Sequence, residues 1–110
     1  MIYSIPQPTN DTAVVIVSWC VKEVIFGSNP QRTQHLLGYI KEENAGRVTS
    51  AIQCFDQEKM IIKTSSGRVY QLYGGPSTHD DALYVWKNWK KDNDARGELD
   101  VTHQYLISDM

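Results

Sequence analysis

Residues 47–73 constrain the fold most, because three short runs with strand-type alternation follow one another with turn signals between them. The runs are "RVTSAIQCFD" (47–56), "MIIKTS" (60–65) and "RVYQLY" (68–73). The second turn ends in Gly67, a residue that adopts a positive φ without steric cost. Strands this short and this closely joined pair with their chain neighbours, so the segment predicts an antiparallel meander.

Two earlier segments also predict strands. Residues 13–26 are rich in β-branched side chains, which indicates one long strand, or two short ones separated by a bulge near Cys20–Lys22. Residues 35–43 carry mixed signals, because their leucines and charged end would suit a short helix. Gly38 weakens a helix by roughly 1 kcal/mol relative to alanine, so a strand is the preferred prediction.

The segment "GGPSTHDDALYVWKNWKK" (74–91) has the signals of a helix in the expected order. Its glycines and proline end the preceding strand, and Ser77 or Thr78 is the expected N-cap. Asp80 and Asp81 fall in the first turn, where the helix dipole favours carboxylates, and lysines follow near the end.

One apolar stripe runs along this predicted helix. Ala82, Val85, Trp86 and Trp89 are spaced at i, i+3, i+4 and i+7. The stripe predicts a helix over about 78–92 that lies across one face of the sheet.

After the helix, residues 91–99 predict a polar connection, and the alternation over 100–107 predicts a final strand. Together these elements predict one α+β domain over residues 1–110. It would contain an antiparallel sheet of about five strands with one helix packed on one face.

Composition limits the possible partners. The chain has a formal net charge of −2 and a pI of about 5.8, so it has no long-range attraction for nucleic acid or anionic membranes.

The longest apolar-rich run is interrupted by Ser18, Lys22 and Glu23 and is too short to span a bilayer. The first residues lack the pattern of a secretory signal. A soluble cytoplasmic protein with no membrane partner is expected.

Residue types that bind metals are present without metal-site spacing. The candidates are Cys20, Cys54, His35, His79 and His103. They form no C-x-x-C, H-x-x-x-H or H-E-x-x-H pattern, so no metal and no cofactor is predicted. The cysteines are interpreted as small buried apolar residues, and the sequence leaves open whether they lie close together.

Catalytic chemistry has a similarly weak signal. His79 and Asp80 are adjacent, but neighbouring helical residues point about 100° apart and do not face each other as a base and its orienting group must. His79 is therefore interpreted as a surface residue of the first helical turn. No catalytic residue is predicted. A third hypothesis is a small ligand-binding or enzymatic domain. This function would need His79, His103 and Cys54 to converge.

The alternative function is binding of single-stranded nucleic acid. Lys63, Arg68, Tyr70 and Tyr73 fall around one predicted hairpin. A sheet that presents aromatic side chains among cations can stack unpaired bases. The acidic total charge and the lack of an RNA-binding sequence motif argue against this function.

A protein-interaction or regulatory module is the preferred prediction. The chain contains six tyrosines and three tryptophans, and these residue types anchor many protein interfaces. One helix covers one face of a sheet, which leaves the other face for a protein partner or a second copy in a homodimer. The candidate contacts are Tyr70, Leu72, Tyr73 and Tyr84. Small acidic proteins of this kind are associated with bacterial mobile elements and phage.

Overall fold

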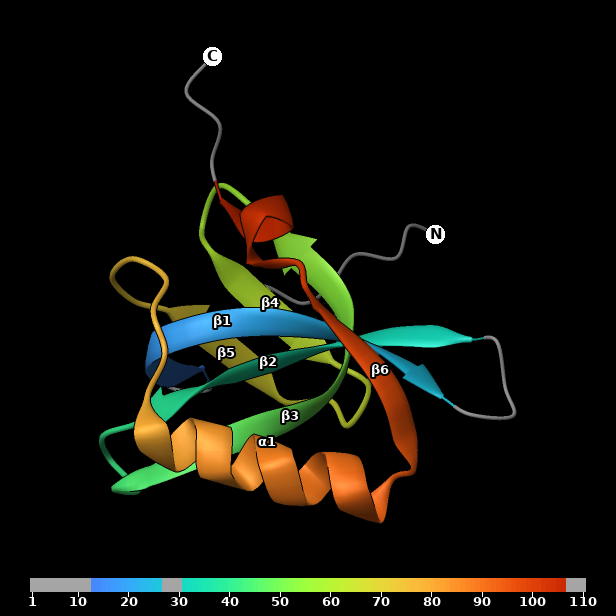
Figure 1. Cartoon of the computed structure of the whole chain (residues 1–110). Coiled ribbons are helices and arrows are strands. Elements are labelled where there is room, and N and C mark those ends of the chain that lie inside the picture. The colour runs from blue at the N-terminus through green and yellow to red at the C-terminus, as the bar shows by residue number, and fades with distance from the viewer. Residues whose placement is uncertain (1–12, 27–30, 107–110) are drawn as a thin grey trace.

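The computed structural model describes residues 13–26 and 31–106, and these form an α+β fold (Figure 1). Its elements are β1 (Val14–Phe26), β2 (Arg32–Ile40), β3 (Ala45–Asp56), β4 (Ile61–Thr64), β5 (Val69–Leu72), α1 (Asp80–Asp92), β6 (Ala95–Asp100) and the 3₁₀ helix η1 (Thr102–Tyr105). The predicted antiparallel meander, the strand preferred for the mixed segment and the helix are all confirmed.

The strand pairings close into a ring. Each of β1 to β4 pairs antiparallel with the next strand along the chain, and β5 returns to pair in parallel with the start of β1. β6 pairs antiparallel with the second half of β1. The ring is therefore a small barrel to which β6 adds one further strand.

β1 and β3 bend sharply, because each contributes to two differently oriented parts of the sheet. In β1 the register shifts between Val17 and Cys20, and Ser18 has a φ of 49°. This irregularity begins slightly earlier than the predicted bulge. In β3 a second shift lets both Ile52 and Phe55 pack on the interior cluster, although regular alternation would place two residues at this spacing on opposite faces.

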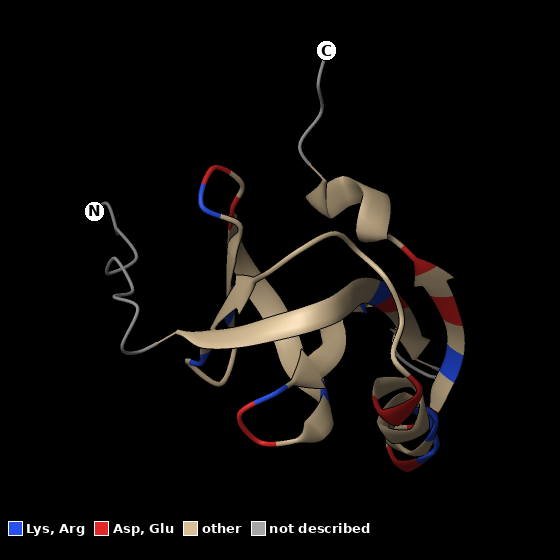
Figure 2. Cartoon of the chain, turned by 90° about the vertical axis from the view of Figure 1, so that its left-hand side faces the viewer, with Lys and Arg blue, Asp and Glu red and all other residues tan. Residues whose placement is uncertain are grey.

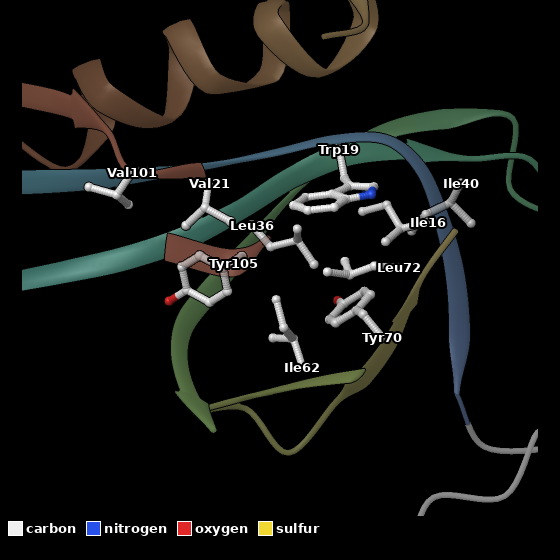
Figure 3. Close-up of a cluster of buried hydrophobic side chains, with 10 residues drawn as sticks. All are labelled: Ile16, Trp19, Val21, Leu36, Ile40, Ile62, Tyr70, Leu72, Val101 and Tyr105. Carbon is white, nitrogen blue, oxygen red and sulfur yellow. The ribbon is translucent and has the colours of Figure 1, made fainter. Parts of the chain in front are cut away.

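Apolar side chains fill the interior of the barrel, on the side of β1 and β2 that faces away from α1 (Figure 3). Trp19 is fully buried, and its Nε1 donates a hydrogen bond to the carbonyl oxygen of Gly74 at 3.0 Å. Tyr105 of η1 packs on Phe55 with their ring centroids 4.8 Å apart. The cluster consists of Ile16, Trp19, Val21, Leu36, Ile40, Ile62, Tyr70, Leu72, Val101 and Tyr105.

Helix α1 covers the outer face of β1, β2 and β3, where Ala82 and Trp86 are buried against a second apolar cluster. The helix approaches β3 closely at Gly46: a Cβ there would lie 2.4 Å from the backbone nitrogen of Ala82. Only a residue without a side chain permits this contact. Gly46 therefore permits the backbone of α1 to lie this close to β3.

The chain after the helix differs from the prediction. The predicted polar connection over 91–99 contains most of β6, and the described part of the predicted strand over 100–107 is mainly the 3₁₀ helix η1; residue 107 lies outside the described residues. The chain turns because the Oδ1 atom of Asp100 accepts a hydrogen bond from the backbone N–H of Thr102 at 2.9 Å. The turn directs both Val101 and Tyr105 into the barrel and leaves His103 exposed, whereas an extended strand would place all three side chains on one face.

Candidate functional site

The four residues predicted to contact a partner divide into a buried pair and an exposed pair. Tyr70 is 1% exposed and Leu72 is 5% exposed, because both point into the barrel. The Tyr70 hydroxyl accepts a hydrogen bond from Arg47 Nη1 at 3.1 Å. These two residues are core residues, and the expectation that their strand face is available to a partner is corrected. Tyr73 and Tyr84 are 66% and 69% exposed, so these two side chains are accessible at the surface.

Tyr73 belongs to an exposed surface that we call the β1–β5 face, formed by Val15, Gln71 and Tyr73. Val15 pairs directly with Gln71 across the parallel strands, and the Tyr73 backbone N–H donates to the carbonyl oxygen of Ile16 at 3.0 Å. Val15 is 44% exposed. Helix α1 packs instead on β2, β3, β6 and the later part of β1, where Cys20 and Val24 belong to the apolar cluster under the helix. Within the described residues, this outer part of the barrel is left uncovered.

Tyr84 lies elsewhere, on the solvent side of α1. Leu83 next to it is also more than a third exposed, and Lys87 and Lys91 follow at helical spacing. The structure therefore separates the two exposed tyrosines onto different elements.

The residues of the nucleic-acid alternative are not brought together on one surface. Arg68 is exposed in the hairpin, and Lys63 pairs with Val69 on the outer side of β4 and β5. Tyr73 lies beyond the opposite end of β5, and Tyr70 is inside the barrel. A base could stack on only one of the two predicted tyrosines.

His79 is the N-cap of α1, which corrects both the predicted Ser77 or Thr78 cap and the first-turn assignment of His79. Its Nδ1 accepts a hydrogen bond from the backbone N–H of Asp81 at 3.1 Å. Its ring stacks on Tyr39, with centroids 4.1 Å apart and an interplanar angle of 16°. The Nδ1 atom of His79 therefore caps the helix and is not the base of a dyad with Asp80.

His35 is a buried polar residue beneath the helix. Its Nδ1 lies 2.9 Å from the Thr49 carbonyl oxygen, and its Nε2 lies 2.7 Å from Thr33 Oγ1. Its ring also contacts Trp86 and Trp89, which stack on each other at 5.3 Å. Burial lowers the pKa of His35, and the hydrogen bond to Thr49 only partly opposes this effect.

A charged network that the sequence did not indicate joins α1, β1 and β6. Trp86 Nε1 donates to both carboxylate oxygens of Glu98, at 3.2 and 3.3 Å, and Lys90 pairs with the same carboxylate. Lys22 lies 3.8 Å from Glu98 and 3.4 Å from Asp100. Burial alone would raise the pKa of Glu98, but the hydrogen bonds and nearby lysines outweigh it and lower the pKa.

The cysteines and histidines do not form a metal site in the part of the chain that the structure describes, where no group of three or more ligand residues converges. Both cysteines are free thiols. Cys20 is buried in the cluster under the helix, and this burial raises the pKa of its thiol. His103 is exposed in η1, and His79 caps α1.

Comparison of the chain with models of protein families, with curated proteins and with solved structures gives no match. Among the described helices, none has the length and apolarity needed to cross a membrane. The fold and these surfaces define a class: a small α+β barrel protein with one docked helix.

Proposed function

We propose that the chain is a non-catalytic protein-interaction module that acts as a homodimer and presents the β1–β5 face to a protein partner. One observation carries this proposal. Val15 and Tyr73 expose 44% and 66% of their surface on a sheet face that the docked helix leaves uncovered. An aromatic side chain beside an aliphatic one on an open face is a typical anchor for a partner surface.

The chemistry of the described residues supports an interaction role over catalysis. His79 uses its inward ring nitrogen as a helix cap, and His35 lies between the helix and the sheet. The three groups that an enzymatic site would need are His79, His103 and Cys54, and they lie at the start of α1, in η1 and in β3. His79 serves as the helix cap, and neither His103 nor Cys54 has an activating partner among these three groups.

Self-association is tested by measuring the mass in solution by light scattering over about 1 µM to 1 mM, the range in which weak to moderate protein contacts form. The proposal predicts a rise from the monomer to the dimer mass. A monomer mass at every concentration would contradict the homodimer.

The partner surface is tested by placing a photo-crosslinking amino acid at Tyr73 or, as a control, at the equally exposed Tyr84. In cells that naturally carry the gene, we expect irradiation to link a second protein to the position-73 variant and not to the position-84 variant. Equal crosslinking at both positions, or none at position 73, would exclude the β1–β5 face as the partner surface.

Single-stranded nucleic-acid binding is the second candidate. Its support is now limited to Lys63, Arg68 and Tyr73, because Tyr70 is buried. Salt-sensitive binding of an oligonucleotide that Tyr73→Ser weakens would favour this candidate. The cytoplasmic location, the regulatory role and the association with bacterial mobile elements or phage stay predictions from the sequence.

A further inference from the structure

The outer edge of β6 is an open strand edge within the described residues. Each strand of the ring has neighbours on two sides, whereas β6 pairs only with β1. The Val101 N–H donates to the Val21 carbonyl oxygen at 2.9 Å, and the register continues through Leu99 opposite Glu23. Because backbone groups alternate in direction along an antiparallel ladder, those of Glu98 point to the open edge.

This edge has less protection by charge than its sequence suggests. Open edges are usually protected from pairing by charged side chains, and β6 carries Glu98 and Asp100. Lys22 and Lys90 form ion pairs with these two carboxylates, so the four groups have no net charge. In Figure 2, β6 runs along the right-hand margin of the molecule with its charged residues in succession.

We propose that a second copy of the chain pairs antiparallel with β6, with the two Glu98 residues directly opposite each other at the two-fold axis. In this register the two Glu98 residues exchange both of their outward backbone hydrogen bonds. The inference rests on the proposed homodimer and names the surface that forms it. It leaves the β1–β5 face free for a different protein.

Lys22 and Lys90 offset the repulsion between the two central Glu98 carboxylates, and the flanking residues of β6 are self-complementary in this register. Arg96 lies opposite Asp100 of the second copy, and Gly97 lies opposite Leu99 of the second copy, as follows from counting outward from Glu98. The first pair joins opposite charges, which stabilises cross-strand pairs. Leu99 is 49% exposed, and Gly97 has no side chain to obstruct it.

The space beside Gly97 is apolar. A Cβ atom on Gly97 would lie 3.6 Å from Ile25 Cδ1. Leu99 of the second copy therefore covers Ile25 in this arrangement, and the two sheets join into one continuous sheet. Strand addition at an edge obtains its affinity from such main-chain bonds and its specificity from alternating side chains.

A proline substitution tests the main-chain bonds directly. Glu98→Pro removes the outward N–H and leaves the hydrogen bonds of Leu99 and Gly97 to β1 in place. Glu98→Ala is the matched control, because it also removes the carboxylate but keeps the N–H. We expect Glu98→Pro to weaken dimerisation at least about tenfold more than Glu98→Ala does. Circular dichroism checks that both variants are folded.

A charge reversal tests the register. Arg96→Glu would face Asp100 of the second copy, and we expect it to weaken the dimer. Arg68→Glu makes the same change at an exposed position in a distant hairpin and is expected to leave dimerisation unchanged. A dimer that Glu98→Pro and Arg96→Glu do not affect would overturn the inference and leave the homodimer standing. A strictly monomeric wild-type protein would overturn both.

Discussion

At the scale of single residues, two histidines have opposite surroundings and separate structural roles. His79 is at the start of α1 and half-buried, with one ring nitrogen accepting the Asp81 N–H. His35 is 4% exposed and has hydrogen bonds at both ring nitrogens. Both were considered from the sequence as possible ligands or bases, and both have hydrogen bonds within the fold.

The cap predicts a moderate loss of stability. His79→Ala should lower the free energy of unfolding by about 1 kcal/mol, because the Asp81 N–H loses its acceptor. His79→Ser should recover most of that loss, because a serine oxygen can accept the same hydrogen bond. Urea denaturation of the three proteins measures both effects. Equal stability of His79→Ala and the wild type would show that the cap contributes nothing.

The buried His35 predicts a pH dependence of stability. Burial lowers its pKa in the folded state, whereas the unfolded chain keeps the ordinary value of about 6.5. Between these two pKa values the unfolded state binds more protons, so the free energy of unfolding falls as the pH decreases below about 6.5. The loss is complete once the pH is below the folded-state pKa.

His35→Gln isolates this effect, because the variant keeps His79 and His103 unchanged. Denaturation at several values between about pH 7.5 and pH 5 should give a shallower pH dependence for His35→Gln than for the wild type. Parallel curves for the two proteins would refute the assignment to His35.

At the scale of elements, the docking of α1 depends on one large side chain. Trp86 is 3% exposed, stacks on Trp89 and donates to Glu98. Trp86→Ala should lower the free energy of unfolding by about 3–5 kcal/mol, because it leaves a cavity and removes these contacts. Tyr84→Ala on the exposed side of the same helix is the control, with an expected change within about 0.5 kcal/mol. Similar losses for both variants in chemical denaturation would contradict this account of helix docking.

The docking of α1 also depends on Gly46, which has no side chain. Gly46→Ala should destabilise the fold by about 1–3 kcal/mol, because the added methyl group would overlap the backbone of α1. Gly75→Ala adds the same methyl group where no atom lies within 4 Å, and it should change stability by less than about 0.5 kcal/mol. Thermal denaturation compares the two, and an unaffected Gly46→Ala would show that the helix can shift outward at little cost.

Local sequence signals were sufficient for most elements. The apolar stripe of α1 and the turn signals around the meander describe contacts within about ten residues, and these predictions are confirmed. β6 was missed because "ARGELD" has no β-branched residue and Leu99 is its single large apolar residue. Its strand conformation comes from pairing with β1, a contact between distant parts of the chain.

At the scale of the whole molecule, barrel closure decided which predicted site residues are accessible. Alternation correctly placed Tyr70 and Leu72 on one face of their strand, but it could not distinguish the inside of a barrel from the outside. The parallel pairing of β5 with β1 places that face inside. The fold was therefore needed to show which of the predicted tyrosines are exposed and that β6 has an open edge.

Residue-resolved amide hydrogen exchange tests the central claim, that β6 pairs with its own copy, most directly. The Leu99 amide faces β1 and should be protected at every protein concentration. The Glu98 amide faces the open edge, so it should exchange rapidly in dilute protein and slowly where the dimer forms. Rapid exchange of Glu98 at concentrations where the mass has doubled would contradict the account.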